Sequence, residues 1–245
     1  MDEPLPPVLQ ALWGIERGAR RGPRPQLTVT GVARAGIELA DAEGLAAVSM
    51  ARVAKQLGVT PMALYRYVAS KDELVLAMVD EAYGPCPVPA EPADDWRAAL
   101  AAWCRAMRRG LLRHPWVLQI PVTEPPLTPY ALGWMEAGLA ALARTPLTQQ
   151  QRLDTILLGD VYTRGQTLLG LQVQSADSPE AALRYVLHLR ALVSPESHPH
   201  VWAAQASGAL EDEPQEVDFA EASYEFGLGR ILDGVAELIG ATGAD

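Results

Sequence analysis

The most informative part of the sequence is residues 49–71, which read SMARVAKQLGVTPMALYRYVASK. Apolar residues recur at helical spacing on both sides of Gly58, which predicts two short helices. Gly58 can adopt the left-handed backbone that a tight turn between them requires. Thr60 is expected to be the N-cap of the second helix. Pro61 is expected at its first position, where a missing N–H costs nothing. The pattern therefore predicts a helix-turn-helix.

The second short helix is expected to present its outer face to a partner. Leu64 and Val68 lie four residues apart on one face and are predicted to be buried. The remaining side chains then point mostly outward: Pro61, Met62, Ala63, Tyr65, Arg66 and Tyr67. A helix this short is not stable alone, so its exposed face is expected to have a binding role. In a helix-turn-helix the second helix enters the major groove of DNA.

Three features in order carry a resemblance to a known family: Gly58-Val59, the run LYRYV at 64–68 and KDEL at 71–74. Over about residues 27–83 the chain resembles the DNA-binding domain of the TetR family of bacterial repressors. Beyond residue 84 it resembles only that family's helical ligand and dimer domain. The resemblance implies an all-α fold, in which an N-terminal three-helix helix-turn-helix DNA-binding domain joins a larger helical ligand-binding and dimerisation domain.

The resemblance also implies which residues meet DNA. By position, Pro61, Met62, Ala63 and Tyr65 fall at base edges or the nearby backbone, whereas Ser49, Tyr67 and Lys71 fall at phosphates. The full predicted DNA-binding set is Ser49, Arg52, Thr60, Pro61, Met62, Ala63, Tyr65, Arg66, Tyr67 and Lys71. Met62 and Ala63 offer no bidentate hydrogen bonds, so thymine methyl groups are expected targets rather than guanine edges.

The charge distribution agrees with a DNA-binding N-terminal part. The chain of 245 residues has a formal net charge of −10. Between Trp13 and Lys71, however, nine Lys and Arg residues face four acids, a surplus of five positive charges. From Pro85 onward 11 Arg residues face 20 acids, a surplus of nine negative charges. Because phosphate neutralisation is local, a basic region on an acidic remainder suits a DNA-binding protein.

The chain divides into three predicted parts. Residues 1–26 are expected to be a flexible basic arm, either contacting DNA or forming only a solvated tail, and its arginines are Arg17, Arg20, Arg21 and Arg24. Residues 27–84 form the predicted DNA-binding domain, with a first helix at about 29–43 and a capping box of Ser70 and Glu73 opening the last helix. A proline-rich linker follows, and residues 92–245 form the predicted effector-binding and dimerisation domain.

The second domain is predicted to be helical throughout. Its helices are expected at about 94–113, 128–143, 148–174, 178–193, 199–207 and 218–240. No strand pattern, Gly-rich phosphate loop or catalytic Ser, Cys or His motif is visible. The sequence therefore predicts a protein that is not an enzyme.

Aromatic and methionine side chains on successive helices of this domain are the candidate effector site. The predicted ligand-binding residues are Trp103, Met107, Trp116, Trp134 and Tyr162. Helical bundles line apolar pockets in this way, although ordinary core packing is the alternative for each residue. The expected effector is a mostly apolar compound, either aliphatic or aromatic, with one or two hydrogen-bonding points.

Two long helices are candidates for dimerisation. The periodic runs 147–174 and 219–239 correspond to the two late helices that form a four-helix bundle between subunits in the TetR family. The alternative is that both pack within one subunit. The polar run 211–216 between them is expected to be a loop.

Metals, cofactors and membranes are not expected. The four histidines lack the companion acids or cysteines of a zinc site, and Cys86 and Cys104 form neither a disulfide framework nor a metal cluster. No apolar run approaches the roughly 20 residues that cross a bilayer, and no signal peptide is evident, which predicts a cytoplasmic protein.

The leading hypothesis is a homodimeric repressor that binds a palindromic operator in double-stranded DNA and is released by a small apolar ligand. One alternative is a constitutive DNA-binding protein without an effector. Another is an enzyme with an accessory DNA-binding head, which requires a convergent polar site that the sequence does not offer.

Overall fold

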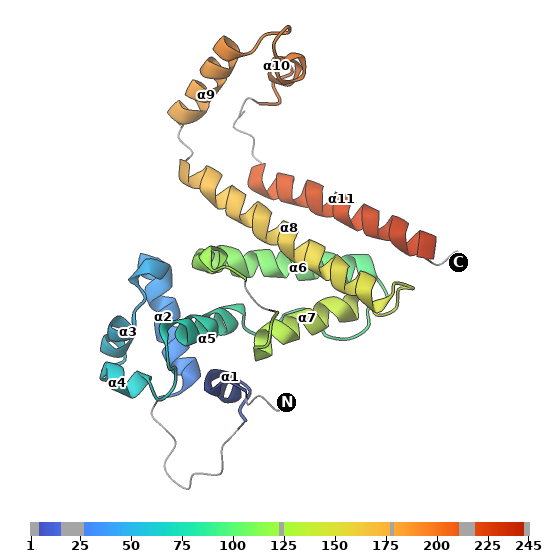
Figure 1. Cartoon of the computed structure of the whole chain (residues 1–245). Coiled ribbons are helices and arrows are strands. Elements are labelled where there is room, and N and C mark those ends of the chain that lie inside the picture. The colour runs from blue at the N-terminus through green and yellow to red at the C-terminus, as the bar shows by residue number, and fades with distance from the viewer. Residues whose placement is uncertain (1–4, 16–26, 123–124, 177–178, 211–218, 243–245) are drawn as a thin grey trace. The chain divides into compact units, whose positions relative to one another are not determined.

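The computed structural model describes residues 5–15, 27–122, 125–176, 179–210 and 219–242. The described part is helical and contains no strand (Figure 1). The helices are α1 (Pro7–Leu12), α2 (Val29–Glu43), α3 (Met50–Gln56), α4 (Pro61–Leu64), α5 (Lys71–Tyr83), α6 (Trp96–Arg113), α7 (Pro129–Ala141), α8 (Gln149–Ala176), α9 (Pro179–Leu192), α10 (Pro199–Ala206) and α11 (Phe219–Thr242). Two 3₁₀ turns, η1 (Leu45–Ala47) and η2 (Pro115–Gln119), complete the set. The predicted all-α class is confirmed.

The chain forms two compact units. One contains Met1–Arg164 with Ile231–Asp245, and the other contains Gly165–Arg230. Helices α8 and α11 each run through both units. Within the first unit we call residues 27–84 the head and residues 92–164 with 231–242 the body.

The head is built on α2 and α5, which pack against each other (Figure 1). Gly36 permits their close approach, because a Cβ atom there would lie 2.6 Å from the Met78 sulfur. The Thr28 hydroxyl caps α2 by accepting the Gly31 amide at 3.0 Å, and Gly44 ends the helix with φ +83°. The sequence placed both ends of this helix correctly.

The predicted capping box at the start of α5 forms in a modified way. The Ser70 hydroxyl accepts the Glu73 amide at 3.1 Å, as expected. The Glu73 carboxylate accepts the amide of Ala69 at 2.6 Å, one residue before the N-cap. Both bonds fix the direction of α5 relative to the residues that connect it to α4.

The expectation of a structureless N-terminal arm is wrong for part of it. Residues 7–12 form α1, which packs on α2 and α5 and buries Val8 and Leu9. The Trp13 indole N–H donates to the Leu127 carbonyl at 2.8 Å. Proline-rich composition suggested a tail, whereas burial of two apolar side chains stabilises a short helix. The four arginines of the predicted arm lie outside the described residues.

The body packs α6 against α7, with α8 crossing both. Trp103 of α6 lies between glycines of the other two helices: a Cβ atom would come within 3.2 Å of its ring at Gly138 and 3.5 Å at Gly159. Arg97 of α6 also forms an ion pair with Asp233 of α11 at 2.6 Å. The turn η2 and helix α6 meet at His114 and Pro115, a corner that the sequence did not predict.

The second unit comprises the end of α8, helices α9 and α10 and the start of α11. Its two long helices approach closely, since a Cβ atom at Gly170 would lie 3.5 Å from that of Ala220. Tyr224 and Leu228 of α11 are buried. The predicted loop at 211–216 lies outside the described residues.

Candidate nucleic-acid interface and effector site

The turn between α3 and α4 is a Schellman motif. Gly58 has φ +68°, the Val59 amide donates to the Ala54 carbonyl at 3.0 Å, and the Gly58 amide donates to the Lys55 carbonyl at 3.2 Å. Both bonds satisfy carbonyls that the end of α3 would leave unpaired. The turn thereby fixes where α4 begins.

Helix α4 is anchored by two fully buried side chains and presents the rest of its surface. Leu64 and Val68 have no exposed area, as predicted. Met62 is 74% exposed and Tyr65 is 49% exposed, so both large side chains are open to a partner. Other predicted contact residues, Thr60, Pro61 and Arg66, are also exposed, while Ala63 and Tyr67 are half-buried. Thr60 is the N-cap of α4 and Pro61 its first residue, as predicted, although the Thr60 side chain makes no cap hydrogen bond.

Ser49 and Arg52 of the predicted interface both have partners in the head. The Ser49 hydroxyl caps α3 by accepting the Arg52 amide at 3.3 Å. The Arg52 guanidinium forms a two-point pair with the Glu43 carboxylate. The hydrogen bond and charge of Arg52 lower the pKa of the Glu43 carboxyl. A phosphate must therefore compete with Glu43 for this arginine.

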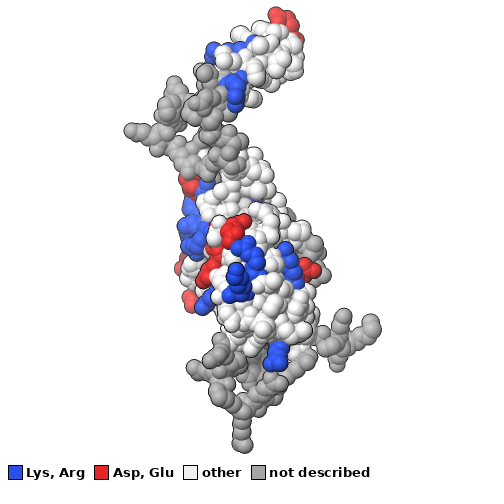
Figure 2. All heavy atoms as spheres, turned by 90° about the vertical axis from the view of Figure 1, so that its left-hand side faces the viewer, with Lys and Arg blue, Asp and Glu red and all other residues white. Residues whose placement is uncertain are grey.

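Lys71 is exposed at the first position of α5. A lysine in the first turn of a helix adds its charge to the positive end of the helix dipole, which suits an anion. Figure 2 views the side of the molecule on which α3 and α4 lie in Figure 1, and basic and acidic atoms are intermixed on it. Four of the arginines in the predicted basic region, Arg17, Arg20, Arg21 and Arg24, lie outside the described residues and do not contribute to this described surface.

Asp80 joins the head to the start of α7. It lies near the C-terminal end of α5, is 2% exposed, and accepts the backbone amides of Tyr130 at 2.9 Å and Ala131 at 3.2 Å. Burial raises the pKa of the Asp80 carboxyl, while hydrogen bonds from Thr128, Ala131 and Tyr130 act in the opposite direction. The carboxylate takes the place of an N-cap for α7 and benefits from that helix's dipole.

Tyr83 and Gly84 make the next connection from head to body. The Trp134 indole N–H donates to the Gly84 carbonyl at 3.0 Å, and its ring lies 6.2 Å from that of Tyr83. Arg164 of α8 donates to the Tyr83 hydroxyl. It also donates to both carboxylate oxygens of Asp160, each at 3.1 Å. Burial raises the pKa of Tyr83. The end of α5 is thus bonded to both α7 and α8.

Asp41 of α2 connects the head to the body at a second place. The Asp41 carboxylate accepts a hydrogen bond from the His114 Nδ1 at 2.9 Å and another from the Trp116 indole N–H at 2.7 Å. Trp116 is 2% exposed, and the His114 and Trp116 rings lie 6.2 Å apart. We call Asp41, His114 and Trp116 the Asp41 cluster.

Sequence reasoning missed these connections, although a signal was present. Asp41, Glu43, Asp80 and Glu81 all lie in the last turns of α2 and α5, where the helix dipole disfavours negative charge. Each has a partner in the structure, Glu81 pairing with Arg34 at 2.7 Å. Acids at helix C-termini therefore indicated tertiary partners.

Four of the five predicted ligand-binding residues are core residues here. Trp103, Met107, Trp116 and Trp134 are buried, and Tyr162 is half-buried. The Trp103 indole N–H donates to the Trp134 carbonyl at 2.8 Å, and the two rings meet edge to face. The indole N–H groups of Trp103, Trp116 and Trp134 therefore all donate to acceptors within the protein.

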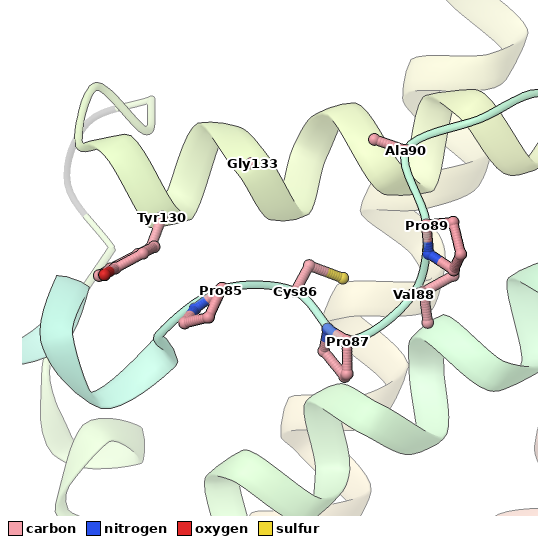
Figure 3. A pocket seen from close by; sticks show the side chains of 8 residues that line it. All are labelled: Pro85, Cys86, Pro87, Val88, Pro89, Ala90, Tyr130 and Gly133. Carbon is pink, nitrogen blue, oxygen red and sulfur yellow. The ribbon is translucent and has the colours of Figure 1, made fainter.

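A shallow groove of about 370 Å³ lies elsewhere, between the linker and α7. Pro85, Cys86, Pro87, Val88, Pro89 and Ala90 line one side, and Tyr130 and Gly133 the other. Figure 3 shows the linker running alongside α7, with the Tyr130 ring at one end and Ala90 at the other. None of the five predicted ligand-binding residues lines this groove.

The helical head, with a tight turn presenting an exposed second helix, defines a helix-turn-helix DNA-binding protein. The family profile described as "Bacterial regulatory proteins, tetR family" matches residues 33–78, and "Tetracyclin repressor-like, C-terminal domain" matches residues 88–239. The chain belongs to the TetR family of transcriptional regulators.

Relatives and solved structures agree with this assignment. The chain is similar to the transcriptional repressor DrrR1 of Streptomyces coeruleorubidus, with 37% identity covering 95% of this chain and 86% of the relative. It is 28% identical to the repressor Rv1353c of Mycobacterium tuberculosis, covering 94% and 87%. Apo ActR from Streptomyces coelicolor has the same fold, with a TM-score of 0.76, 24% identity and coverage of 89% and 99%. ActR in complex with actinorhodin gives a TM-score of 0.71, 24% identity and coverage of 86% and 96%.

In the described residues no helix is both long and apolar enough to span a membrane. The relatives reported above are named as transcriptional repressors.

Proposed function

We propose that the protein is a homodimeric repressor that binds a palindromic operator and is released from it by a small, mostly apolar ligand. Residues 27–84 bind DNA in this proposal, and residues 92–245 bind the effector and form the dimer. The observation that carries it is α4, whose Met62 and Tyr65 are exposed while Leu64 and Val68 hold the helix from beneath. Stable proteins expose such side chains where they bind a partner.

The DNA contacts divide by role. Pro61, Met62, Ala63 and Tyr65 are assigned to base edges or the nearby backbone, and Ser49, Tyr67 and Lys71 to phosphates. Met62 offers only apolar contact, so the expected operator presents thymine methyl groups to it. Arg52 reaches a phosphate only when it leaves Glu43.

Dimerisation is supported by an uncovered apolar stripe on α8. In the first unit Leu157 is 59% exposed and Val161 is 58% exposed; in the second unit Leu168, Leu169 and Val173 of the same helix are also exposed. Phe226 and Leu238 of α11 are also exposed. Apolar residues at this spacing along one helix suit packing against a second copy. The dimer places two α4 helices at half-sites about 34–36 Å apart.

The effector is assigned to the interior of the body, around the five predicted residues. Because the indole N–H groups of Trp103, Trp116 and Trp134 already have acceptors, these residues offer a ligand mainly apolar ring surface. ActR, whose fold is similar, has been solved with actinorhodin and with (S)-DNPA. These complexes support a ligand-responsive body, and a mostly apolar effector fits the side chains available.

The DNA-binding half of the proposal is tested by selecting DNA fragments with the purified protein and measuring affinity against salt. Lys71→Gln is expected to weaken all sequences about equally and to reduce the magnitude of the log–log salt slope by about 0.9, the value of one phosphate contact. Arg109→Gln, an exposed arginine of α6, is the matched control and should change neither. A loss confined to the selected operator would contradict the assignment of Lys71 to phosphate.

The effector half is tested by titrating apolar aromatic compounds while following tryptophan fluorescence and operator binding together. Release of DNA over the same concentrations that quench fluorescence is the expected result. Quenching without release would leave a binding site but contradict induction. No response to any compound would favour the constitutive DNA-binding alternative.

A further inference from the structure

The Asp41 cluster is an attachment between head and body that no proposed DNA contact explains, and one of its members, Trp116, is also a proposed effector residue. Asp41 belongs to α2, the first helix of the head, whereas His114 and Trp116 form the corner between α6 and η2 in the body. One carboxylate oxygen, Oδ1, accepts from both side chains, and Oδ2 lies 3.0 Å from the His114 Nδ1. Two donors from one rigid corner thus converge on a single side chain of the head.

The corner that supplies these donors is itself well fixed. The His114 amide donates to the Gly110 carbonyl at 3.1 Å, which ends α6, and the Val117 amide donates to the His114 carbonyl at 3.0 Å. Pro115 restricts the backbone between the two donors. Trp116 is buried, so its indole N–H has no access to water as a substitute partner. The His114 and Trp116 donors are therefore held in fixed directions, and these directions determine where the Asp41 carboxylate must lie.

The other side-chain attachments of the head described above all lie at the C-terminal end of α5, through Asp80, Tyr83 and Gly84. They bind α7 and α8, whereas Asp41 of α2 binds the end of α6. Attachments at one helix end alone would let the head rotate about that end. A further attachment on α2 opposes this rotation, because α2 and α5 pack against each other.

We propose that Asp41 is a positioning residue that sets the orientation of the head on the body, through His114 and Trp116. This inference rests on the proposed function, because orientation matters only when two heads must meet two half-sites at once. A dimer whose two heads are already held in the required orientation binds both half-sites without the entropic cost of ordering the heads. Loss of the Asp41 cluster leaves each head intact but frees its orientation.

The test compares a full palindromic operator with DNA that carries one half-site, using the full-length dimer. Asp41→Ala is expected to lower affinity for the full operator about tenfold and to leave half-site affinity within twofold. Alanine is favourable within a helix, so α2 should persist. A merely structural defect of the head would weaken both DNAs together.

Glu38→Ala is the matched control. It lies on the same helix, removes the same charge and also removes a hydrogen bond, but its partner is Gln56 of α3, at 2.5 Å, within the head. Its ratio of full-operator to half-site affinity should equal that of the unmodified protein. A similar drop in this ratio for both variants would overturn the proposal.

Variants on the body side keep the proposal testable if Asp41→Ala folds poorly. His114→Leu and Trp116→Phe each remove one donor and should lower the same ratio, whereas His114→Asn keeps a donor near the Nδ1 position and should restore it. An unchanged ratio in His114→Leu and Trp116→Phe would overturn the role of Asp41 while leaving the proposed repressor intact. If the unmodified protein shows no preference for any selected DNA, the proposed function fails instead.

Discussion

The head and the body of this protein differ in where their structural information lies. In the head, Ser49, Gly58 and Ser70 determine helix ends through bonds to residues no more than a few positions away. In the body, Trp103 and Trp134 are defined by neighbours on other helices, such as the glycines at 138 and 159. Local bonds can be read from a sequence, and distant packing cannot.

The comparison also shows how the two regions use aromatic residues. Tyr65 of the head is 49% exposed, so its expected role lies in binding. Trp134 of the body is buried, meets two other aromatic rings and bonds to the Gly84 carbonyl. Tyr65 is therefore expected to affect DNA affinity more than stability, whereas Trp134 is expected to affect stability in addition to its proposed effector contact.

The largest expected effect is on the dimer. Leu168→Arg and Ile231→Glu each place a charge in the proposed interface, where an unpaired buried charge costs about 3–5 kcal/mol, or roughly a hundredfold or more in the dimer dissociation constant. Sedimentation should show monomers, and operator binding should be lost although the head remains folded. Leu112→Arg, on the exposed face of α6, is the control and should remain a dimer. A dimeric Leu168→Arg would remove α8 from the interface.

The next effect separates stability from DNA binding. Trp134→Phe should lower the free energy of unfolding by about 1–3 kcal/mol, because the half-buried Gly84 carbonyl loses its donor. Tyr65→Ala, at an exposed position, should change stability by less than about 0.5 kcal/mol but weaken operator binding. Chemical denaturation and DNA titration of both variants measure the contrast. Equal losses of stability would contradict the division between head and body.

A smaller effect concerns the pH dependence of stability. Burial raises the pKa of Asp80, so the folded protein binds more protons than the unfolded chain above the ordinary aspartate pKa of about 3.9. Stability contributed by this group is therefore lost as pH rises from about 4. The stability of the unmodified protein relative to Asp80→Asn should fall over that range in denaturation experiments at successive pH values.

Glu43→Gln gives the opposite sign and serves as the comparison for Asp80. Arg52 lowers the pKa of Glu43, so the Glu43 contribution is present above the ordinary glutamate pKa and is lost as pH falls. Relative to each variant, the free energy of unfolding of the unmodified protein should therefore change with pH in opposite directions for Asp80→Asn and Glu43→Gln. Slopes of the same sign would contradict the structural account of Asp80.

The smallest expected effect is chemical. Burial raises the pKa of Cys104 to about 12, whereas Cys86 lies half-buried in the linker. A thiol reagent at pH 8 should label Cys86 in the native protein and Cys104 only after unfolding. Cys86→Ser should abolish native labelling, and its persistence would mean that the body opens around Cys104.

The outcome for the head shows how far local chemistry reaches. The sequence predicted α2 at its observed bounds, the turn at Gly58 and the burial of Leu64 and Val68. It also placed Thr60 correctly at the N-cap of α4, although the Thr60 side chain makes no cap hydrogen bond, since such a bond forms only if the backbone directs the hydroxyl toward a free amide. It was wrong about residues 7–12, because α1 depends on burial against α2 and α5.

The amino-acid sequence by itself determined the all-helical class, the helix-turn-helix and the family, since periodicity, caps and one glycine turn depend on neighbours along the chain. Tertiary structure alone decided that Asp41 meets His114 and Trp116, and that Asp80 caps α7. It also decided that Trp103 and Trp134 use their N–H groups inside the core. The physical reason is that a buried donor or acceptor is satisfied by whichever group packing brings within about 3 Å, and sequence separation does not specify that group.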